Sequence, residues 1–554
     1  MSQAFINNQA CDIKQGETIY QFVSRHLGEN EIPALCHDES LQPFGNCRMC
    51  CVEVAQSENA KRRVMASCHT PVETGHYVFT ASAAIKKLRS TIMELLLSDY
   101  PDNKLEPGDD EKSTPFQTLA QQIKIKNNRF PVNKSRRQPD TSHPYIHFDA
   151  AQCIHCYRCI RTCDEVQGEM VLAMRGRGYD SGIIFSMDQS VKDSECVACG
   201  QCVQTCPTNA LTDRYHAKTI NEDQRVRTVC TYCGVGCNFD VLLKNKKIVA
   251  MEAVNDAEVN QGHACLKGRY AFEYYNHPDR LTTPLIRKDN KLQAASWDEA
   301  LDYIAEMLTT VKQRNGVQSI AGISSSRCTN EENYLMQKFM RVVIGNNNID
   351  GCARVCHAPT AFGMRQVFGT GAATNSIDEI PLADCLLVVG ANVTEAHPVT
   401  GAKIRQRGMK GIPLIVIDPR RIELTRYATH HLQLRPGTNV ALLDMFIYYL
   451  IKEQLVDEAF VTSRTQGFDD FKQAALGIDL DRLEAITGVD RQQVRAAAIT
   501  YGQAHTAMCF HGLGLTEHYQ GSRGVLLLAS IAMMTGNIGR PGVGVNPLRG
   551  QSNV

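Results

Sequence analysis

Sixteen cysteines fall into four groups whose spacing is typical of metal ligands. The first group has the spacing C-x10-C-x2-C-x17-C and consists of Cys36, Cys47, Cys50 and Cys68. Zinc sites usually show two close pairs, whereas an isolated cysteine, a C-x2-C pair and a distant cysteine suit loops around a 2Fe-2S cluster. The group predicts one 2Fe-2S cluster, with a zinc knuckle as the alternative.

The second and third groups form an internal repeat with the spacing C-x2-C-x2-C-x3-C. They are Cys153, Cys156, Cys159, Cys163 and Cys196, Cys199, Cys202, Cys206. In bacterial ferredoxins the fourth cysteine of each run binds the cluster of the other run. We therefore expect one 4Fe-4S cluster on Cys153, Cys156, Cys159 and Cys206, and another on Cys163, Cys196, Cys199 and Cys202.

The fourth group lies in CTYCGVGC and HACLKGR and consists of Cys230, Cys233, Cys237 and Cys265. Four sulfurs suit a third 4Fe-4S cluster, and Gly234 and Gly236 let the backbone curl closely around it. Lys267 follows two residues after the last ligand. A lysine there is ordinarily solvated, but beside a cluster its charge would favour the reduced state.

Length and composition limit the other possibilities. A chain of 554 residues exceeds one hydrophobic core and predicts three to five domains. Lys+Arg and Asp+Glu both total 59, so no net field steers the protein toward nucleic acid or anionic lipid. The N-terminus lacks a secretion signal and no stretch has the length of a membrane span, so we expect a cytoplasmic protein with reduced thiols.

From about residue 296 the pattern changes to alternating helices and apolar runs. Ser296 and Glu299 form a capping box that predicts a helix start. The apolar segments 385–392 and 413–421 are typical of a parallel sheet covered on both faces, and polar residues follow each one, where such sheets bind nucleotides. Residues 434–443 form a glycine-containing loop into a helix, with Asn439 near its start; such a loop can hold phosphate but is usually only a turn.

Seven motifs then occur in a fixed order: CTYCGVGC, CLKGR, CARVCHAP, ANVTEAHP, IDPRR, PGTNVALL and TGNIGRPGVGVNPLRGQ. With them the chain resembles the catalytic subunit of molybdenum- or tungsten-dependent formate dehydrogenases. It looks like the cytoplasmic form, with an N-terminal ferredoxin extension similar to that of the large subunit of respiratory NADH dehydrogenase. The resemblance runs over nearly all of the chain.

The resemblance implies that Cys356 is a thiolate ligand of the metal, which two pterin guanine dinucleotides and a sulfido group hold otherwise. A soft thiolate suits such a metal, although by residue type alone Cys356 could equally be a buried structural thiol. His357 would be a proton acceptor or an electrostatic partner, and the fork of Arg549 would clamp the carboxylate of formate. The candidate cofactor-binding residues are Lys267, Asn392, Glu395, Asp418, Arg420, Gly437, Asn439 and Gln551.

The expected fold class is a multidomain combination of α/β and α+β parts. The expected domains are a β-grasp-like 2Fe-2S ferredoxin domain (1–85), a helix with a polar linker (86–142), a bacterial-type 2x4Fe-4S ferredoxin domain (143–217), a small 4Fe-4S domain (224–281) and an incomplete doubly wound α/β molybdopterin core (282–554).

Two features depart from the family. A cluster held by one histidine and three cysteines often follows the 2Fe-2S domain, but here Tyr100 stands in that region and residues 98–142 contain no cysteine, so we expect that cluster to be absent. The chain also ends at Val554, whereas the family continues through more α/β core and a β-rich domain. This predicts a fragment, a second polypeptide that supplies the missing half, or a chain that no longer catalyses.

The predicted function is formate oxidation to carbon dioxide, with electrons leaving through pterin, Lys267, the Cys230 cluster, the paired clusters and the 2Fe-2S centre. The acceptor would be a partner subunit or carrier, such as a flavin- and NAD-binding subunit, a quinone-linked protein or a ferredoxin. The alternatives are a non-catalytic iron-sulfur electron-transfer chain and a related oxidoreductase for another small oxyanion such as nitrate.

Overall fold

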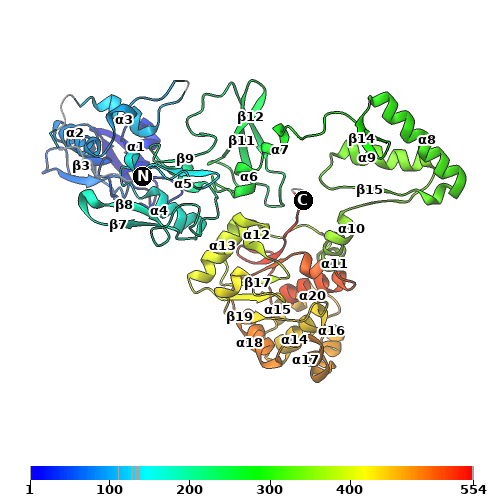
Figure 1. The fold of residues 1–554 in the computed structure, drawn as a ribbon. Helices are drawn as coiled ribbons and strands as arrows, with labels where there is room; N and C mark the ends of the chain where they lie inside the picture. Colours follow the sequence, from blue (N-terminus) through cyan, green and yellow to red (C-terminus); the bar gives the residue numbers. More distant parts are fainter. Residues whose placement is uncertain (1, 110, 126–128, 131–137, 552–554) are drawn as a thin grey trace. The chain divides into compact units, whose positions relative to one another are not determined.

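The computed structural model describes residues 2–109, 111–125, 129–130 and 138–551. Its contacts divide the chain into two compact units, residues 1–228 with 238–272 and residues 229–237 with 273–554 (Figure 1). Each unit has hydrophobic cores of its own. In the part of the chain that the structure describes, no helix combines the length and the apolar character needed to cross a bilayer.

The first unit begins with a mixed five-stranded sheet in the order β2-β1-β5-β3-β4, in which only β1 and β5 are parallel. The elements are β1 (Gln3–Ile6), β2 (Gln9–Asp12), α1 (Ile19–Leu27), β3 (Cys51–Ala55), β4 (Arg63–Ala66) and β5 (Tyr77–Phe79). Thr18 and Gln21 form a capping box at the start of α1, whose apolar face, including Phe22 and Val23, joins the core of the sheet. A mixed sheet covered by a helix agrees with the predicted β-grasp-like domain.

The next segment contains α2 (Ala83–Ser98), η1 (Asp102–Lys104) and α3 (Pro115–Ile123). Tyr100 and Phe116 are buried and pack against each other with ring centroids 4.7 Å apart. They share a core with Cys36 and Cys156. The description of this region as a helix with a polar linker therefore missed apolar side chains that pack against two cysteine loops.

The repeated cysteine runs give two similar halves. The elements are β6 (Ile146–Phe148), η2 (Ala150–Gln152), α4 (Arg158–Thr162), η3 (Cys163–Gln167), β7 (Leu172–Arg175), η4 (Gly178–Asp180), β8 (Gly182–Phe185), α5 (Gln201–Thr205) and β9 (Leu211–Asp213). β6 pairs with β9 and β7 with β8, both antiparallel. Left-handed backbone recurs at matching places, at His155 and Tyr157 before α4 and at Ala198 and Gly200 before α5. The sequence repeat is therefore also a backbone repeat.

A three-stranded sheet follows in the order β10-β11-β12, and a short helix ends the first unit. The elements are β10 (Gln224–Val229), β11 (Asn238–Lys244), β12 (Lys247–Ala253) and α6 (Leu266–Tyr270). Cys265 is the residue before the first turn of α6.

The second unit is built on a parallel five-stranded sheet in the order β19-β18-β17-β20-β21. The strands are β17 (Cys385–Val389), β18 (Leu414–Ile417), β19 (His430–Leu432), β20 (Ala507–His511) and β21 (Gly544–Pro547). The chain runs outward from β17 on one side and from β20 on the other, so the strand order reverses between these two neighbours. This is the doubly wound topology expected for residues 282–554, and its parallel strands agree with the apolar segments.

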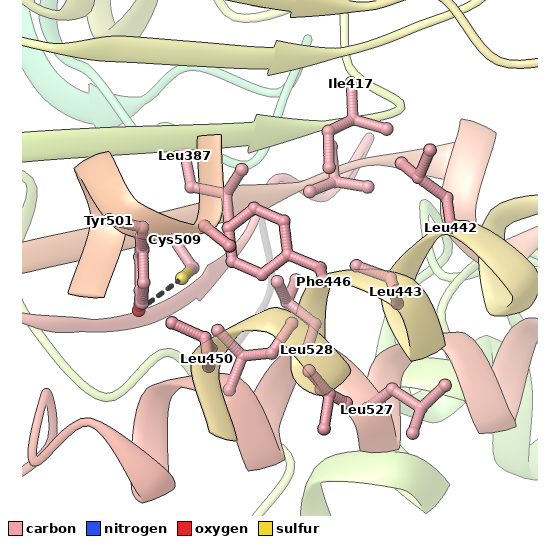
Figure 2. Packing of buried hydrophobic residues seen from close by; sticks show 14 of the residues in the cluster. Leu387, Ile417, Leu442, Leu443, Phe446, Leu450, Tyr501, Cys509, Leu527 and Leu528 are labelled. Carbon is pink, nitrogen blue, oxygen red and sulfur yellow. Dashed lines mark hydrogen bonds between the residues drawn. The ribbon is translucent and has the colours of Figure 1, made fainter. Parts of the chain in front are cut away.

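The central strands of this sheet are buried on both sides, because helices cover both faces. The helices are α10 (Ala353–Cys356), α11 (Ala358–Phe368), η7 (Ile377–Leu382), α12 (Val393–Ala396), α13 (Pro398–Met409), η8 (Glu423–Arg426), α14 (Asn439–Lys452), α15 (Glu458–Arg464), α16 (Phe468–Leu476), α17 (Leu480–Thr487), α18 (Arg491–Gly502), α19 (Leu513–Thr516) and α20 (Gly521–Met534). Phe446 of α14 and Leu528 of α20 pack under Leu387 of β17, and Tyr501 is hydrogen-bonded to the sulfur of Cys509 at 3.2 Å (Figure 2). On the other face, Leu386 and Val388 pack with Ile404 of α13.

A further part of this unit carries exposed apolar side chains. It contains α7 (Glu273–Asn276), β13 (Leu285–Lys288), β14 (Lys291–Ala294), α8 (Trp297–Asn315), η5 (Val317–Ser319), β15 (Gly322–Ser324), α9 (Asn330–Lys338), η6 (Phe339–Ile344) and β16 (Ile349–Gly351). Ser296 caps α8 as predicted, but Glu299 pairs with Lys288 instead of completing the box. The apolar face of α8 is largely open, with Leu301 56% and Ile304 50% exposed.

Gly390, at the end of β17, allows a close approach that other residues would prevent. Its φ is +58°, and a Cβ there would lie 2.5 Å from the carbonyl carbon of Gly514. Gly390→Ala should destabilise the second unit by roughly 2–4 kcal/mol, because left-handed strain and overpacking add. Gly411→Ala is the matched control, since Gly411 also has positive φ but open space around it, and should cost about 1 kcal/mol. Equal unfolding free energies for the two variants in denaturant titrations would contradict this.

Candidate functional site

The candidate cofactor residues of the second unit gather at one edge of its sheet. Because the strands are parallel, residues that follow them lie at the same edge. Asn392 and Glu395 follow β17, Asp418 and Arg420 follow β18, Gly437 and Asn439 follow β19, and Arg549 and Gln551 follow β21. Loops after neighbouring strands that diverge at a topological switch point form the crevice in which such sheets bind nucleotides.

These residues differ in what their side chains do. The carboxylate of Asp418 is buried and accepts a hydrogen bond from the backbone N–H of Arg420 at 2.9 Å. The guanidinium of Arg420 is 68% exposed. Asn439 donates to the carbonyl oxygen of Gly514 at 3.2 Å, which holds α14 against the turn after β20. Asp418 and Asn439 therefore shape the edge, whereas Arg420 extends into solvent.

Cys356 is buried where α10 ends. Its sulfur lies 3.9 Å from Oε1 of Gln551, and its carbonyl oxygen accepts a hydrogen bond from Thr516 at 2.6 Å. Burial, with smaller contributions from Glu517 and Cys352, raises the pKa of the thiol, and nearby Arg549 opposes this only in part. Without a metal this side chain is therefore a neutral thiol at pH 7. The structure brings Cys356 together with Gln551, although the two are 195 residues apart in sequence.

His357 is fixed by hydrogen bonds at both ring nitrogens. Nε2 lies 3.1 Å from the carbonyl oxygen of Leu548, and Nδ1 lies 2.9 Å from Oγ1 of Thr360. Burial, followed by the charge of Arg549, lowers the pKa of His357 to about 4, so the ring is neutral at pH 7. A carbonyl only accepts, so Nε2 carries the single proton and Nδ1 accepts from the Thr360 hydroxyl.

The same argument fixes a second histidine. Nε2 of His511 lies 3.0 Å from Oγ1 of Thr360. Because the Thr360 hydroxyl has already donated its proton to His357, Nε2 of His511 must donate to Thr360. Nδ1 of His511 is then a bare acceptor, and it is buried without a hydrogen-bond partner among the described residues. Burial lowers the pKa of His511 to about 3, so this ring is neutral too.

Arg549 is placed mainly through its backbone. Its carbonyl oxygen accepts from Nε2 of His397 at 2.6 Å and from the backbone N–H of Gly234 at 2.9 Å. A Cβ at Gly234 would lie 2.6 Å from that same oxygen, so only glycine permits the contact. Gly234 therefore joins the cysteine-rich loop to the arginine motif, a role that we did not predict for it.

The guanidinium of Arg549 makes one hydrogen bond within the described part of the chain, from Nη2 to the carbonyl oxygen of Gly371 at 2.5 Å. Burial lowers the pKa of Arg549, and Cys356 opposes this. A half-buried guanidinium remains charged because its intrinsic pKa is so high. It can therefore offer its remaining N–H groups to a small carboxylate.

The first cysteine group converges in the first unit. The sulfur of Cys50 lies 3.3 Å from that of Cys68, and the backbone N–H of Cys47 donates to the sulfur of Cys36 at 3.3 Å. Hydrogen bonds from the thiols of Cys47 and then Cys68 lower the pKa of Cys36, which places these sulfurs side by side. The neighbouring Cys51 belongs to β3.

The repeated runs line two separate cavities. One cavity is lined by Cys153, Cys156, Cys159 and Cys206, and the other by Cys163, Cys196, Cys199 and Cys202. Each set contains three cysteines from one run and the fourth from the other, which is the exchange that we predicted from the ferredoxin pattern. Four converging sulfurs fit the donor set of a 4Fe-4S cluster.

The fourth group is divided between the units. Cys230, Cys233 and Cys237 belong to the second unit, where the backbone N–H of Cys230 donates to the carbonyl oxygen of Cys237 at 2.7 Å. Cys265 and Lys267 belong to the first unit, at the start of α6. The assignment of these residues to one cluster stays a prediction.

Five residues of the candidate site were missed at the level of sequence: Cys352, Thr360, His397, His511 and Thr516. Cys352, Thr360 and His397 stand within or beside quoted motifs, so their positions held a usable signal. His511 and Thr516 carried none, because they reach the site only through the packing of β20 and α19.

Four family models match successive parts of the chain. They are the 2Fe-2S iron-sulfur cluster binding domain (3–83), the ferredoxin-like domain of NADH-quinone oxidoreductase subunit 3 (143–212), the molybdopterin oxidoreductase Fe4S4 domain (223–277) and molybdopterin oxidoreductase (280–553). The chain therefore belongs to the molybdopterin oxidoreductases and carries an iron-sulfur extension. The match of residues 3–83 favours the 2Fe-2S interpretation over a zinc knuckle.

Several known proteins are similar to this chain. It is 32% identical to the probable oxidoreductase YjgC of Bacillus subtilis over 99% of this chain and 59% of that protein. It is 45% identical to formate dehydrogenase H of Escherichia coli over 60% of this chain and 47% of that protein. The F420-dependent formate dehydrogenase subunit alpha of Methanocaldococcus jannaschii is 43% identical over 59% of this chain and 48% of that protein. The chain spans about half the length of these relatives.

The fold is similar to that of acetylene hydratase from Pelobacter acetylenicus. The TM-score is 0.50 and the identity 25%, over 58% of this chain and 44% of that one. This agrees with the family assignment from sequence.

The hydroxyl of Thr360 connects two buried rings, which gives a direct test of the derived hydrogen-bond order. Thr360→Val should leave Nδ1 of His357 and Nε2 of His511 unpaired and lower the free energy of unfolding by about 1–3 kcal/mol. Thr360→Ser keeps the hydroxyl and should stay clearly closer to the parent chain. If both variants unfold at the same denaturant concentration, the hydroxyl does not join the rings.

Proposed function

We propose that this chain is the pterin-binding and iron-sulfur part of a formate dehydrogenase, which oxidises formate to carbon dioxide. The observation that carries the proposal is the convergence of Cys356, His357 and Arg549 at the carboxyl edge of a doubly wound sheet. Identity of 43–45% to two formate dehydrogenases over about 60% of the chain adds support.

The residues present fit a pterin-bound molybdenum or tungsten centre. A buried sulfur, Cys356, offers a soft ligand, and a cationic neighbour, Arg549, favours its thiolate. Asn392, Glu395, Asp418, Arg420, Gly437, Asn439 and Gln551 would hold the pterin dinucleotides along the sheet edge, with Lys267 between pterin and cluster. When bound, such a centre supplies a two-electron acceptor.

Arg549 would bind the substrate. Formate is a carboxylate with one C–H bond, and a planar guanidinium can hold both of its oxygens. Held in this way, the C–H bond is the only part of formate left to face the position of Cys356. Because the backbone of Arg549 is tied to Gly234 and His397, the clamp is fixed before substrate arrives.

For His357, the geometry favours the electrostatic role over that of proton acceptor. Both ring nitrogens are engaged, one as a donor to Leu548 and the other as an acceptor from Thr360. A base needs a lone pair within reach of the proton that it takes. We therefore propose that His357 is a neutral, oriented dipole that excludes water beside Cys356.

The overall reaction is that formate becomes carbon dioxide, one proton and two electrons. The proton is released to solvent, and the electrons leave through the iron-sulfur clusters. We propose that the Cys230, Cys233, Cys237 and Cys265 cluster receives them first, followed by the paired clusters and then the 2Fe-2S centre on Cys36, Cys47, Cys50 and Cys68.

Two alternatives have support of their own. A non-catalytic iron-sulfur electron-transfer chain would use only the cysteine groups, two of which line cavities of their own. A small oxyanion other than formate, such as nitrate, would also be bound by a guanidinium. In either case the clusters would form, but formate would not reduce them.

The acceptor would be a partner subunit or carrier, such as a flavin- and NAD-binding subunit, a quinone-linked protein or a ferredoxin. A cytoplasmic location suits a chain with 23 cysteines, most of them grouped like metal ligands, because that compartment keeps thiols reduced.

A further polypeptide, continuous with this chain or separate, would supply the rest of the relatives' length. We propose that it covers the open apolar face of α8, α9 and η6, where Trp297 is 68%, Tyr334 62% and Val342 72% exposed. So many large apolar side chains on neighbouring elements are rare on a surface that stays in water.

The proposed activity is tested with chain produced with molybdenum or tungsten and with its natural partners. We expect about 14 iron atoms per chain, and formate-dependent reduction of a viologen dye. Cys356→Ala should abolish dye reduction. Arg549→Lys should lower kcat/KM for formate by roughly tenfold to a hundredfold, because a lysine cannot make the paired hydrogen bonds.

Arg354→Lys is the control, since Arg354 lies in the same short helix as Cys356 but is 71% exposed, and its kcat/KM should stay within about twofold. Full dye reduction by preparations without molybdenum or tungsten would refute the proposal. So would reduction of nitrate with no response to formate.

Whether the open apolar face becomes covered can be followed by tryptophan fluorescence, because Trp297 of α8 is the single tryptophan of the chain. In the 554-residue chain alone, acrylamide should quench its fluorescence readily, since the indole is 68% exposed. In the longer protein or the assembly isolated from cells, quenching should fall several-fold because the indole becomes buried. Equal quenching in both preparations would show that this face stays open.

A further inference from the structure

The two cavities lined by the repeated cysteines differ in the charges beside them. Each cavity is lined by four sulfurs, three from one run and one from the other. If the surroundings were equivalent, two clusters held there would be equally easy to reduce. The differences lie at Cys206 in the first cavity and at Glu169 in the second.

Lys218 places a positive charge at the first cavity. Its ammonium group donates to the carbonyl oxygens of Cys206 and Thr208, both at 2.6 Å. None of the ion pairs found among the described residues includes Lys218, and the carboxylate of nearby Asp213 accepts instead from the backbone N–H groups of Tyr215 and Ala217. The charge is therefore held by neutral carbonyls of the cluster loop itself.

Thr208 adds a hydrogen bond at the same corner. Its hydroxyl oxygen accepts from the backbone N–H of Ala210 at 3.1 Å and lies 3.5 Å from the sulfur of Cys206. Since a deprotonated sulfur only accepts, the hydroxyl must donate to it when Cys206 binds iron. Both contacts thus stabilise negative charge on the same ligand.

The second cavity has a different balance. Arg269 donates to the carbonyl oxygen of Cys199 at 2.9 Å, but the carboxylate of Glu169 belongs to a residue that lines the cavity. A negative group there offsets the positive one. Reduction adds an electron, so a nearby cation favours it and a nearby anion opposes it, most strongly where water is excluded.

We propose that Lys218, supported by Thr208, makes the cluster on Cys153, Cys156, Cys159 and Cys206 the more easily reduced of the pair. This rests on the proposed function only for the presence of 4Fe-4S clusters in the two cavities, and not on formate as substrate. Lys218 is a positioning residue in this sense, since it acts through the charge that it holds beside a ligand.

The location of the first cavity indicates in which direction the difference in reduction potential would drive electrons. Arg158, in the helix that carries Cys159, forms an ion pair with Asp38 of the 2Fe-2S loop at 2.5 Å, and Arg161 donates to the carbonyl oxygen of Cys36 at 3.2 Å. The second cavity instead contacts α6 through Arg269. Electrons that enter beside α6 would therefore move downhill toward the 2Fe-2S loop.

The test is a redox titration of the clusters, followed by electron paramagnetic resonance, with mediators and dithionite and without formate. Lys218→Met should lower the ratio of reduced to oxidised cluster about tenfold at a fixed potential for one 4Fe-4S signal, about 59 mV for a one-electron couple. The other signals should not move. Lys218→Arg keeps the charge and should behave like the parent chain.

Arg269→Gln is the matched control, because it removes the cation from the second cavity and should shift the other signal of the pair. Should Lys218→Met fail to bind iron, Thr208→Val carries the test, since the lost hydrogen bond to Cys206 lowers the same potential. Unchanged midpoints in a Lys218→Met or Thr208→Val chain with full iron content would overturn the proposal. Because no substrate is used, this result is independent of whether formate is oxidised.

Discussion

The crowding of buried sulfur atoms is the constraint on which the first unit depends. Burial, followed by the neighbouring cysteines, raises the pKa of Cys159 and Cys202 well above that of a free thiol, so these groups resist becoming thiolates by themselves. Positive iron removes this cost, and its binding energy becomes folding energy. Left-handed backbone at His155, Tyr157 and Ala198 fits the same picture, because such strain persists only where surrounding contacts over-determine it.

In the second unit the corresponding constraint is a sheet that is buried on both faces. Its apolar strands β17 and β18 offer no polar side chains for binding a cofactor. The candidate cofactor residues of this unit therefore lie in the loops and helix starts that follow the strands, at the carboxyl edge of the sheet. Close approach of Gly390 to Gly514 brings β17 and the turn after β20 together at the switch point. The first unit thus depends on cysteine sulfurs gathered where metal can bind, and the second on an interior from which polar groups are excluded.

Sequence patterns succeeded where a short stretch of chain carries the whole signal. Apolar runs located β17 and β18, Ser296 located the start of α8, and the cysteine repeat predicted the exchange between the two cavities. Sequence patterns failed where the burial of a side chain depends on another segment that packs against it. Residues 86–142 were expected to be a helix with a polar linker, but Tyr100 and Phe116 are buried in that region. The apolar side of α8 is largely exposed. Periodicity shows that a face is apolar, not what covers it.

By itself, the sequence determined which cysteines are grouped as candidate iron ligands. These groups follow from residue type and local spacing, because ligands of one cluster loop are only a few residues apart. The roles of Cys356 and Arg549 were implied by the resemblance of the motifs and stay proposals. Only the tertiary structure decided how the groups are oriented and charged. His357 and His511 meet through Thr360 across 151 residues, and Lys218 reaches Cys206 because a turn folds back on the cluster loop. Such contacts depend on packing between distant segments, which no local pattern encodes.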